Sequence, residues 1–268
     1  MRLVPGAGRI AASATAVHGR VYVLGGYFVD RHGGELTVPD VSVYEPSTRR
    51  WYRAADLPTP VDDTIAGVYR DRFLYVLGGW SNTDSVSDVQ VYDVETEKWQ
   101  KAIPIPGRPV FGHAGSIVDD TIVYVDGAYK NPAGAPKYLP SEECWMGKIR
   151  HNDVTQIQWS KLQVHPGHAH YRIAAGPSEK DQRIYFPGGT NNPYNFDGMG
   201  YDGHPSEPSP VTFAFNIRTG TWERVNENTP QPTMDHRGLV VTPEGLVIVG
   251  GMEKGQRVTA RVQVISLK

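Results

Sequence analysis

The sequence contains a short β-rich run that recurs along the chain and ends in glycine. Four copies end in a glycine pair: Val21–Gly26, Leu74–Gly79, Ile184–Gly189 and Val247–Gly251. A fifth copy, Val123–Gly127, keeps a single glycine. Self-similar segments at such intervals are typical of repeat architectures, and runs of β-branched and aromatic residues favour strands. The repeat therefore predicts an all-β chain built from five similar units.

A second signal follows three of these runs at a constant spacing. An aromatic residue stands seven positions before a tryptophan in the pairs Tyr44–Trp51, Tyr92–Trp99 and Phe215–Trp222. Turn-forming residues lie between the two members of each pair, as in 45–48 and 216–220. Such a stretch predicts a tight connection between two antiparallel strands. Each unit is therefore expected to be a small meander.

These glycine pairs and aromatic–tryptophan pairs resemble the kelch repeat family, and the resemblance spans nearly the whole chain. It implies an all-β, kelch-type β-propeller of about five four-stranded blades around a central channel, with residues 1–268 as a single domain. It also implies that the tryptophans are largely buried between blades. Glycines at equivalent positions are expected to end the second strands: Gly25, Gly78, Gly127, Gly188 and Gly250.

Two departures from the repeat qualify this fold. The third unit has only Gly127, a long insertion over 130–143, and Asn152 seven positions before Trp159, so the third blade is expected to be irregular. The fifth unit ends at Lys268 after one strand beyond its glycines. The last blade is therefore expected to be incomplete or closed by the N-terminus, where residues 1–4 are available.

Composition excludes several classes of function. The formal charge is −2 and the basic residues form no run, so the positive surface that nucleic acid requires is not expected. No apolar run reaches the length of a membrane span. Cys144 is the single cysteine, which excludes an internal disulfide framework. The chain as given has no signal peptide, so it is expected in the cytoplasm, or in the periplasm or outside the cell if a signal was removed.

Loop length is unequal on the two faces of the expected propeller. The turns on the lower face are short, whereas the upper loops over 27–40, 128–143 and 190–210 are long. Long loops on a rigid scaffold are a common location of binding residues. These loops also carry aromatic residues suited to stacking on sugars or to anchoring a protein partner, among them Tyr27, Trp80, Tyr138, Phe196 and Tyr201.

Histidines gather on the same side. Seven of the nine fall in upper loops or at the upper ends of the first strands. Alignment of the units places hydrogen-bonding and titratable groups at the upper mouth of the channel, as a polar small-molecule site requires. The predicted ligand-binding residues are Asp63, His113, His170, Tyr171, Arg172, Asp235, His236 and Arg237. The alternative is that these groups plug the channel through mutual ion pairs.

A second cluster contains types of residue that bind metals. His165, His168 and His170 are followed by a loop that contains Asp197, Asp202, His204 and Glu207. Two or three imidazoles with a carboxylate suit zinc or iron, but no spacing here matches a compact metal motif. The sequence analysis therefore assigns no metal ligand and no cofactor.

Two classes of function remain open. The first is a binding module that contacts a protein partner or a small polar ligand, such as a sugar, through its upper loops. The second is a carbohydrate-processing enzyme, because the chain also resembles the sialic acid mutarotase and galactose oxidase groups of kelch proteins. A mutarotase-like sugar epimerisation needs only a general acid and a general base. A copper centre of the galactose oxidase kind would need Cys144, which lies in the irregular third unit, and an iron site of the plant specifier kind would depend on the 197–207 loop.

Overall fold

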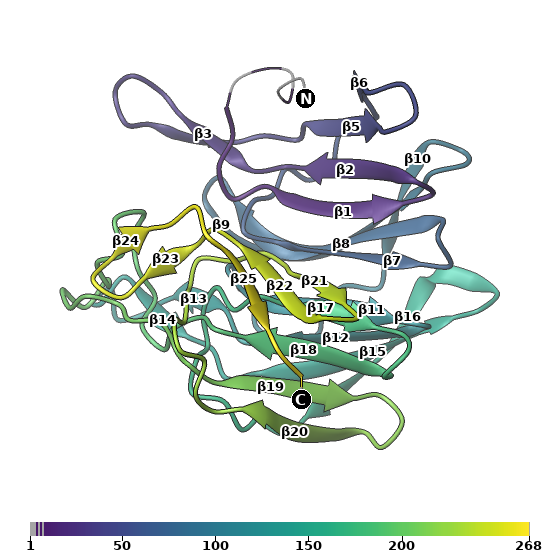
Figure 1. Ribbon diagram of the computed structural model, residues 1–268. Helices are drawn as coiled ribbons and strands as arrows, with labels where there is room; N and C mark the ends of the chain where they lie inside the picture. Colours follow the sequence, from purple (N-terminus) through teal and green to yellow (C-terminus); the bar gives the residue numbers. More distant parts are fainter. Residues whose placement is uncertain (1–3, 5, 7, 268) are drawn as a thin grey trace. The chain divides into compact units, whose positions relative to one another are not determined.

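The computed structural model describes residues 4, 6 and 8–267, and these residues form strands, turns and loops without a helix (Figure 1). The predicted all-β composition is confirmed. The chain divides into two compact units, which are described separately below. Unit 1 contains residues 1–111 and 148–159, and unit 2 contains residues 112–147 and 160–268.

Unit 1 contains two four-stranded antiparallel sheets. The first sheet has the order β1-β2-β5-β6 and the second has the order β7-β8-β9-β10. Their strands are β1 (Ser13–Val17), β2 (Arg20–Leu24), β5 (Val41–Glu45), β6 (Arg50–Arg53), β7 (Ile65–Tyr69), β8 (Phe73–Ser81), β9 (Asp84–Asp93) and β10 (Lys98–Ala102). The pairing registers Tyr44 with Trp51 and Tyr92 with Trp99, as the sequence spacing predicts.

The third sheet has the order β11-β12-β15-β16. Its strands are β11 (Ala114–Val118), β12 (Thr121–Val125), β15 (Cys144–Arg150) and β16 (Asp153–Leu162), and the last two have residues in both units. The sheet thus has as many strands as the first two. The irregularity expected here is confined to the missing glycine and to the insertion between β12 and β15.

Unit 2 contains the fourth and fifth sheets. The fourth has the order β17-β18-β19-β20, with β17 (Gly176–Ser178), β18 (Arg183–Pro187), β19 (Thr212–Asn216) and β20 (Thr221–Asn226). The fifth has the order β21-β22-β25, with β21 (Val240–Thr242), β22 (Gly245–Val249) and β25 (Val262–Ile265). In the described part of the chain this sheet has three strands. Most of the N-terminal segment expected to complete it lies outside the described residues.

The insertions between the second and third strands are themselves ordered. Three form two-stranded hairpins: β3 (Tyr27–Val29) with β4 (Glu35–Thr37), β13 (Ala128–Lys130) with β14 (Tyr138–Pro140), and β23 (Met252–Glu253) with β24 (Arg257–Val258). In the second sheet, β8 and β9 continue their pairing beyond an irregularity at Leu77 to Gly79. The loop after β18 is folded by the bridges Tyr194 to Gly200 and Met199 to Pro205.

The glycine pairs after β2 and β18 lie where the backbone of the following repeat approaches closely. A Cβ on Gly25 would overlap the carbonyl oxygen of Val61, and a Cβ on Gly188 would overlap that of Thr233. The second glycine donates its N–H across the same gap, Gly26 to Val61 at 3.0 Å and Gly189 to Thr233 at 3.2 Å. Both glycines of each pair also have positive φ, which L side chains rarely adopt.

The third unit differs from this pattern at its first glycine. Asp126 (φ 66°) follows β12 at the position of Gly25 and Gly188, and Gly127 matches the second glycine of the other pairs. The expectation that Gly127 is equivalent to Gly25 is therefore wrong by one residue. Gly127 still makes the same bond, donating its N–H to the His170 carbonyl at 2.8 Å.

The tryptophans join each sheet to the segment that follows the previous one. Indole N–H groups donate to main-chain carbonyls, Trp99 to Ala55 at 2.9 Å, Trp159 to Ile103 at 3.4 Å and Trp222 to Gln163 at 2.8 Å. All three rings are partly buried. The expectation was that the tryptophans are largely buried; part of each ring stays exposed, because the fourth strand is at the sheet edge.

We expect Gly188→Ala to destabilise the protein far more than Gly220→Ala. Both glycines have positive φ, but a Cβ on Gly220 has no neighbour within 4 Å, so its cost is the backbone strain alone, about 1–2 kcal/mol. The Gly188 variant must also displace the Thr233 carbonyl. Urea denaturation measures both free energies of unfolding. Equal losses would show that the close approach between repeats is not needed.

We expect Trp222→Ala to lower the free energy of unfolding by about 3–5 kcal/mol, because its ring packs on Phe186, Phe213 and Phe215. Trp222→Phe keeps most of this packing but loses the bond to Gln163, which should cost about 1 kcal/mol. The measurement is thermal or urea unfolding of the three proteins. An alanine variant as stable as the parent would contradict this packing role.

Candidate functional site

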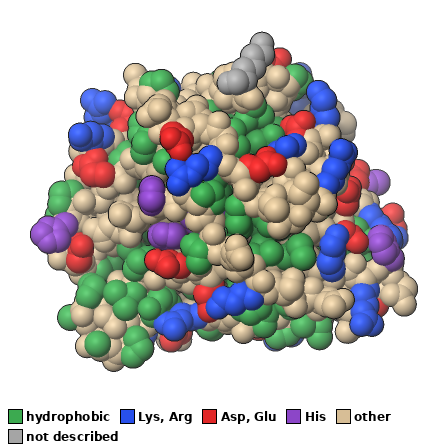
Figure 2. All heavy atoms as spheres, turned by 90° about the horizontal axis from the view of Figure 1, so that it is seen from below, with side chains coloured by type: hydrophobic (Ala, Val, Ile, Leu, Met, Phe, Trp, Pro, Cys, Tyr) green, Lys and Arg blue, Asp and Glu red, His purple; other side chains and the backbone are tan. Residues whose placement is uncertain are grey.

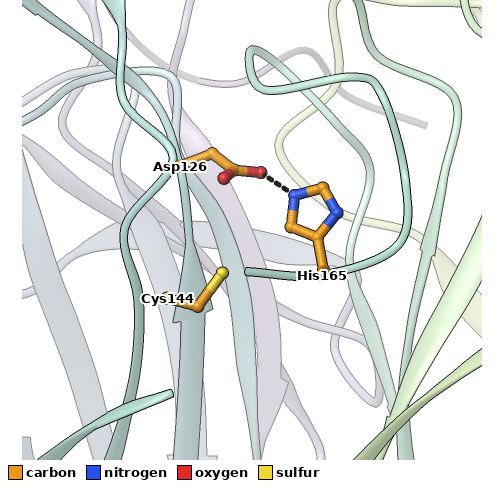
Figure 3. Close-up of side chains that lie close together, drawn as sticks. All are labelled: Asp126, Cys144 and His165. Atoms are coloured by element: carbon orange, nitrogen blue, oxygen red, sulfur yellow. Dashed lines mark hydrogen bonds and ion pairs between the residues drawn. The ribbon is translucent and has the colours of Figure 1, made fainter. Parts of the chain in front are cut away.

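Asp126 forms the centre of a buried cluster in unit 2 (Figure 3). Its Oδ2 lies 2.6 Å from His165 Nε2 and its Oδ1 lies 3.1 Å from His170 Nδ1. The side chains of Asp126 and His165 are 1% and 0% exposed, and that of His170 is 13% exposed. One carboxylate thus accepts hydrogen bonds from two imidazoles.

The thiol of Cys144 lies beside this cluster. A carboxylate oxygen of Asp126, the sulfur of Cys144 and a ring nitrogen of His165 all lie within 4.8 Å of one another. Burial raises the pKa of the thiol well above its ordinary value, and Asp126 adds to this shift. The neutral thiol is therefore the stable form in this environment, and Cys144 is not a ready nucleophile.

The hydrogen bonds of His165 decide what this trio can bind. The backbone N–H of Gly167 donates to His165 Nδ1 at 3.0 Å, so Nδ1 carries a lone pair. A neutral ring then carries its proton on Nε2, which donates to Asp126. Nε2 has no lone pair left for a metal ion in this arrangement. The residues are of metal-binding types, but their hydrogen bonds fit a structural cluster better than a metal centre.

The other members of the predicted metal cluster lie in a different environment. Asp202 accepts hydrogen bonds from the Asn192 side chain at 3.0 Å and from the His204 backbone at 2.9 Å. The hydrogen bond from Asn192 lowers the pKa of Asp202. Asp197 caps the backbone of Met199. These carboxylates therefore stabilise the fold of the 190–210 loop.

Arg172, Asp235 and Arg237 form a second polar cluster in unit 2. Oδ1 of Asp235 lies 3.1 Å from Arg172 Nη1 and 2.8 Å from Arg237 Nη1. Burial raises the pKa of Asp235, but the charges of Arg237 and Arg172 outweigh it and hold this pKa well below the ordinary value. Arg172 also stacks over the rings of Tyr171 and Tyr194. Of the predicted site residues, the structure thus brings together Tyr171, Arg172, Asp235 and Arg237.

The remaining predicted residues take other positions. His113 is buried with its ring edge against Tyr124, and His236 is buried with Nε2 2.9 Å from Thr233 Oγ1. His170 belongs to the Asp126 cluster. Asp63 is buried in unit 1, where its backbone N–H donates to the Ala11 carbonyl.

A shared backbone conformation marks the residues that precede the first strands. Five residues at matching positions have positive φ: Ala11, Asp63, Gly112, Arg172 and Asp235. For a residue other than glycine this conformation costs about 1–3 kcal/mol and is concentrated at functional sites. Three of the predicted site residues are thus held in a conformation that only the surrounding fold can impose.

Comparison with known proteins settles the family. The model of the KLHDC2/KLHL20/DRC7 Kelch-repeats domain matches residues 4–189. The chain belongs to this kelch-repeat family. The solved structure "Structure of YjhT" matches with a TM-score of 0.77 and 19% identity, covering 98% of this chain and 82% of that chain. No curated protein matches.

The fold of this kelch chain is therefore a five-bladed β-propeller, and the predicted fold class is confirmed. Each four-stranded sheet described above is one blade, and the three-stranded sheet is the fifth. Among residues 4, 6 and 8–267 the chain has no helix that could serve as a transmembrane span. The likeness to YjhT supports the fold, and its identity of 19% carries no residue roles to this chain.

We expect His236 to make the protein sensitive to acid. Burial lowers its pKa to about 4, aided by Arg237 and opposed by Asp235. Because the unfolded state binds a proton near pH 6.5, stability should fall as the pH drops from there to about 4, by on the order of 2–3 kcal/mol. Urea denaturation across this range should give a shallower loss for His236→Asn. Parallel curves for the two proteins would contradict a buried neutral His236.

Proposed function

We propose that this kelch chain is a binding module that contacts a protein partner through the insertions of unit 2. These insertions are the β13–β14 hairpin, the 190–210 loop and the β23–β24 hairpin, called the loop face below. The observation that carries the proposal is that the three insertions are joined into one ordered surface that exposes apolar side chains. Kelch domains commonly bind proteins, which agrees with this assignment.

Specific contacts join the three insertions. The rings of Tyr138 and Tyr201 meet edge to face at 4.7 Å between centroids. Gln256 donates from Nε2 to the Ser206 carbonyl at 2.8 Å. A Cβ on Gly198 would lie 2.7 Å from the sulfur of Met252, so the tip of the loop packs on the last hairpin. A surface ordered before binding loses less conformational entropy when a partner docks.

Two hollows flank the 190–210 loop, and Glu207 lines both. One, of about 400 Å³, is lined by Pro136, Tyr138, Leu139, Pro140, Asn191, Asn192, Pro193, Asp202, Pro205 and Glu207. The other, of about 390 Å³, is lined by Glu207, Pro208, Pro230, Gln231, Pro232, Glu253, Lys254, Arg257 and Arg261. Concave regions beside ordered loops accept the side chains that anchor a partner.

Large apolar side chains on the loop face remain exposed. Phe196 is 71% exposed, Met199 is 39% exposed and Val258 is 76% exposed. Apolar groups of this kind, with a polar rim, are typical of protein contacts.

Acidic and basic side chains are interspersed on the face shown in Figure 2. This mixture offers no continuous positive surface for nucleic acid on that face.

A second candidate is a carbohydrate-processing enzyme at the sequence-predicted polar site. The arrangement of Arg172 and Arg237 around Asp235 favours it, because paired guanidinium groups suit the carboxylate of a sugar acid. The resemblance of the sequence to the sialic acid mutarotase group of kelch proteins points to the same class of ligand. Calorimetric titration with N-acetylneuraminate separates the two candidates. If the protein is a carbohydrate-processing enzyme, it should bind this sugar acid, Arg237→Ala should abolish the binding, and Phe196→Asp should leave it intact.

We expect the double variant Phe196→Asp and Val258→Asp to lose the proteins that co-purify specifically with the parent chain. A charge in the contact removes apolar burial and leaves an unpaired group, which typically costs several kcal/mol of affinity. The measurement is affinity purification with quantitative mass spectrometry. Ile103→Asp in unit 1 is the matched control, because Ile103 is also an exposed apolar residue. Retention of the same partners by the folded double variant would contradict the proposal.

A further inference from the structure

Asp126 stands where the other blades have glycine. Its φ of 66° is that of the glycines Gly25, Gly78, Gly188 and Gly250, whose values run from 55° to 76°. Asp tolerates this conformation better than most residues, yet it still costs more than glycine there. The side chain at this position therefore adds contacts that the glycines of the four other blades cannot make.

The carboxylate of Asp126 fixes the protonation pattern of two histidines. Both ring nitrogens of His165 are engaged, because Nδ1 accepts a hydrogen bond from the Gly167 backbone and Nε2 donates one to Asp126. His170 differs, because only its Nδ1 is engaged, at 3.1 Å from Asp126. Asp126 accepts a hydrogen bond at this position, so the neutral His170 ring carries its proton on Nδ1 and its lone pair on Nε2.

The backbone holds His170 in place on both sides. Its N–H donates to the Thr190 carbonyl and its carbonyl accepts from Gly127, each at 2.8 Å. Among the described residues, Nε2 of His170 is not one of the buried side-chain atoms that lack a hydrogen-bond partner, and the side chain is 13% exposed. The ring is therefore fixed in orientation while Nε2 remains accessible.

Charges around the ring favour its protonated form. Burial lowers the pKa of His170, but the hydrogen bond and charge of Asp126 outweigh burial, and Glu142 adds to the rise. The ring of His165 also lies close, with centroids 5.1 Å apart, and is neutral in the tautomer described above. An imidazole whose Nδ1–H is held by a buried carboxylate, with Nε2 accessible, is the arrangement that proton-transferring histidines use.

We propose that Asp126 and His170 form an acid–base pair in which His170 Nε2 exchanges a proton with a hydroxyl-bearing ligand, Asp126 being the positioning residue. At neutral pH, Nε2 accepts the hydroxyl proton, and the imidazolium that forms is stabilised by Asp126. The proton returns to the ligand or to water when the pair reverts. The proposed acid–base pair does not depend on the protein contact proposed for the loop face. A test of one proposal therefore leaves the other undecided.

Asp126→Gly is the variant best suited to test the pair, because it restores the residue of the other blades. We expect it to fold cooperatively, as the backbone conformation at this position suits glycine. Nitrogen-15 NMR of labelled histidine should show the Nδ1–H tautomer of neutral His170 in the parent protein. In the variant the pKa of His170 should fall by about one unit or more, and both tautomers should be populated. Asp126→Asn, which keeps the size of the side chain but not its charge, should also lower this pKa.

Diethyl pyrocarbonate supplies a chemical readout of Nε2. Nε2 attacks a carbonyl carbon, an N–C bond forms, the anhydride C–O bond breaks to release monoethyl carbonate, and the Nδ1 proton is lost. Peptide mapping should find His170 modified and His165 unmodified, because both ring nitrogens of His165 are engaged. The proposal is overturned if neutral His170 carries its proton on Nε2, if His170 does not react, or if the folded Asp126→Gly protein keeps the parent pKa and tautomer.

Discussion

The close approach of backbone between successive repeats is the constraint on which the rest of the structure depends. At Gly25 and at Gly188 the next segment comes so near that a Cβ would overlap its carbonyl oxygen. The same approach lets the second glycine donate a main-chain hydrogen bond across the gap. Within each unit, backbone hydrogen bonds of this kind tie a sheet to the segment that follows it, and the tryptophans provide a second tie at the outer strands.

The same constraint explains where chemistry is found. A glycine position has the next segment within hydrogen-bonding reach, so a side chain placed there contacts that segment directly. Asp126 is the side chain that occupies such a position in this chain. Its carboxylate contacts His165 and His170 on the segment that leads to the fourth blade. A departure from the repeat that resembles decay in the sequence therefore creates a buried polar cluster in unit 2.

The sequence predicted the blades well because the repeat signals are local. Strand pairs such as Tyr92 with Trp99 follow from spacing alone. The partial exposure of the tryptophans was missed, since spacing does not show which strand is at the edge. The role of Asp126 was missed because the third repeat was registered on Gly127. The usable signal was an aspartate, a residue that tolerates positive φ, directly before a glycine that ends a strand.

Prediction of the site was partial for a related reason. Arg172, Asp235 and Arg237 were grouped from sequence, and the structure joins them through shared ion pairs. The positive φ at Asp63, Arg172 and Asp235 left no pattern in the sequence, because only one of the five matching residues is glycine. The loop face was expected from loop length, but its internal contacts depend on pairs distant in sequence, such as Tyr138 with Tyr201.

Hydrogen exchange at the second glycines measures the central constraint most directly. If backbone ties join the repeats, the amides of Gly26, Gly79, Gly127 and Gly189 should exchange as slowly as the amides within strands. The amides of Gly33 and Gly203, which also have positive φ but lie in exposed turns, should exchange far faster. Fast exchange at the second glycines, equal to that in the turns, would contradict the account.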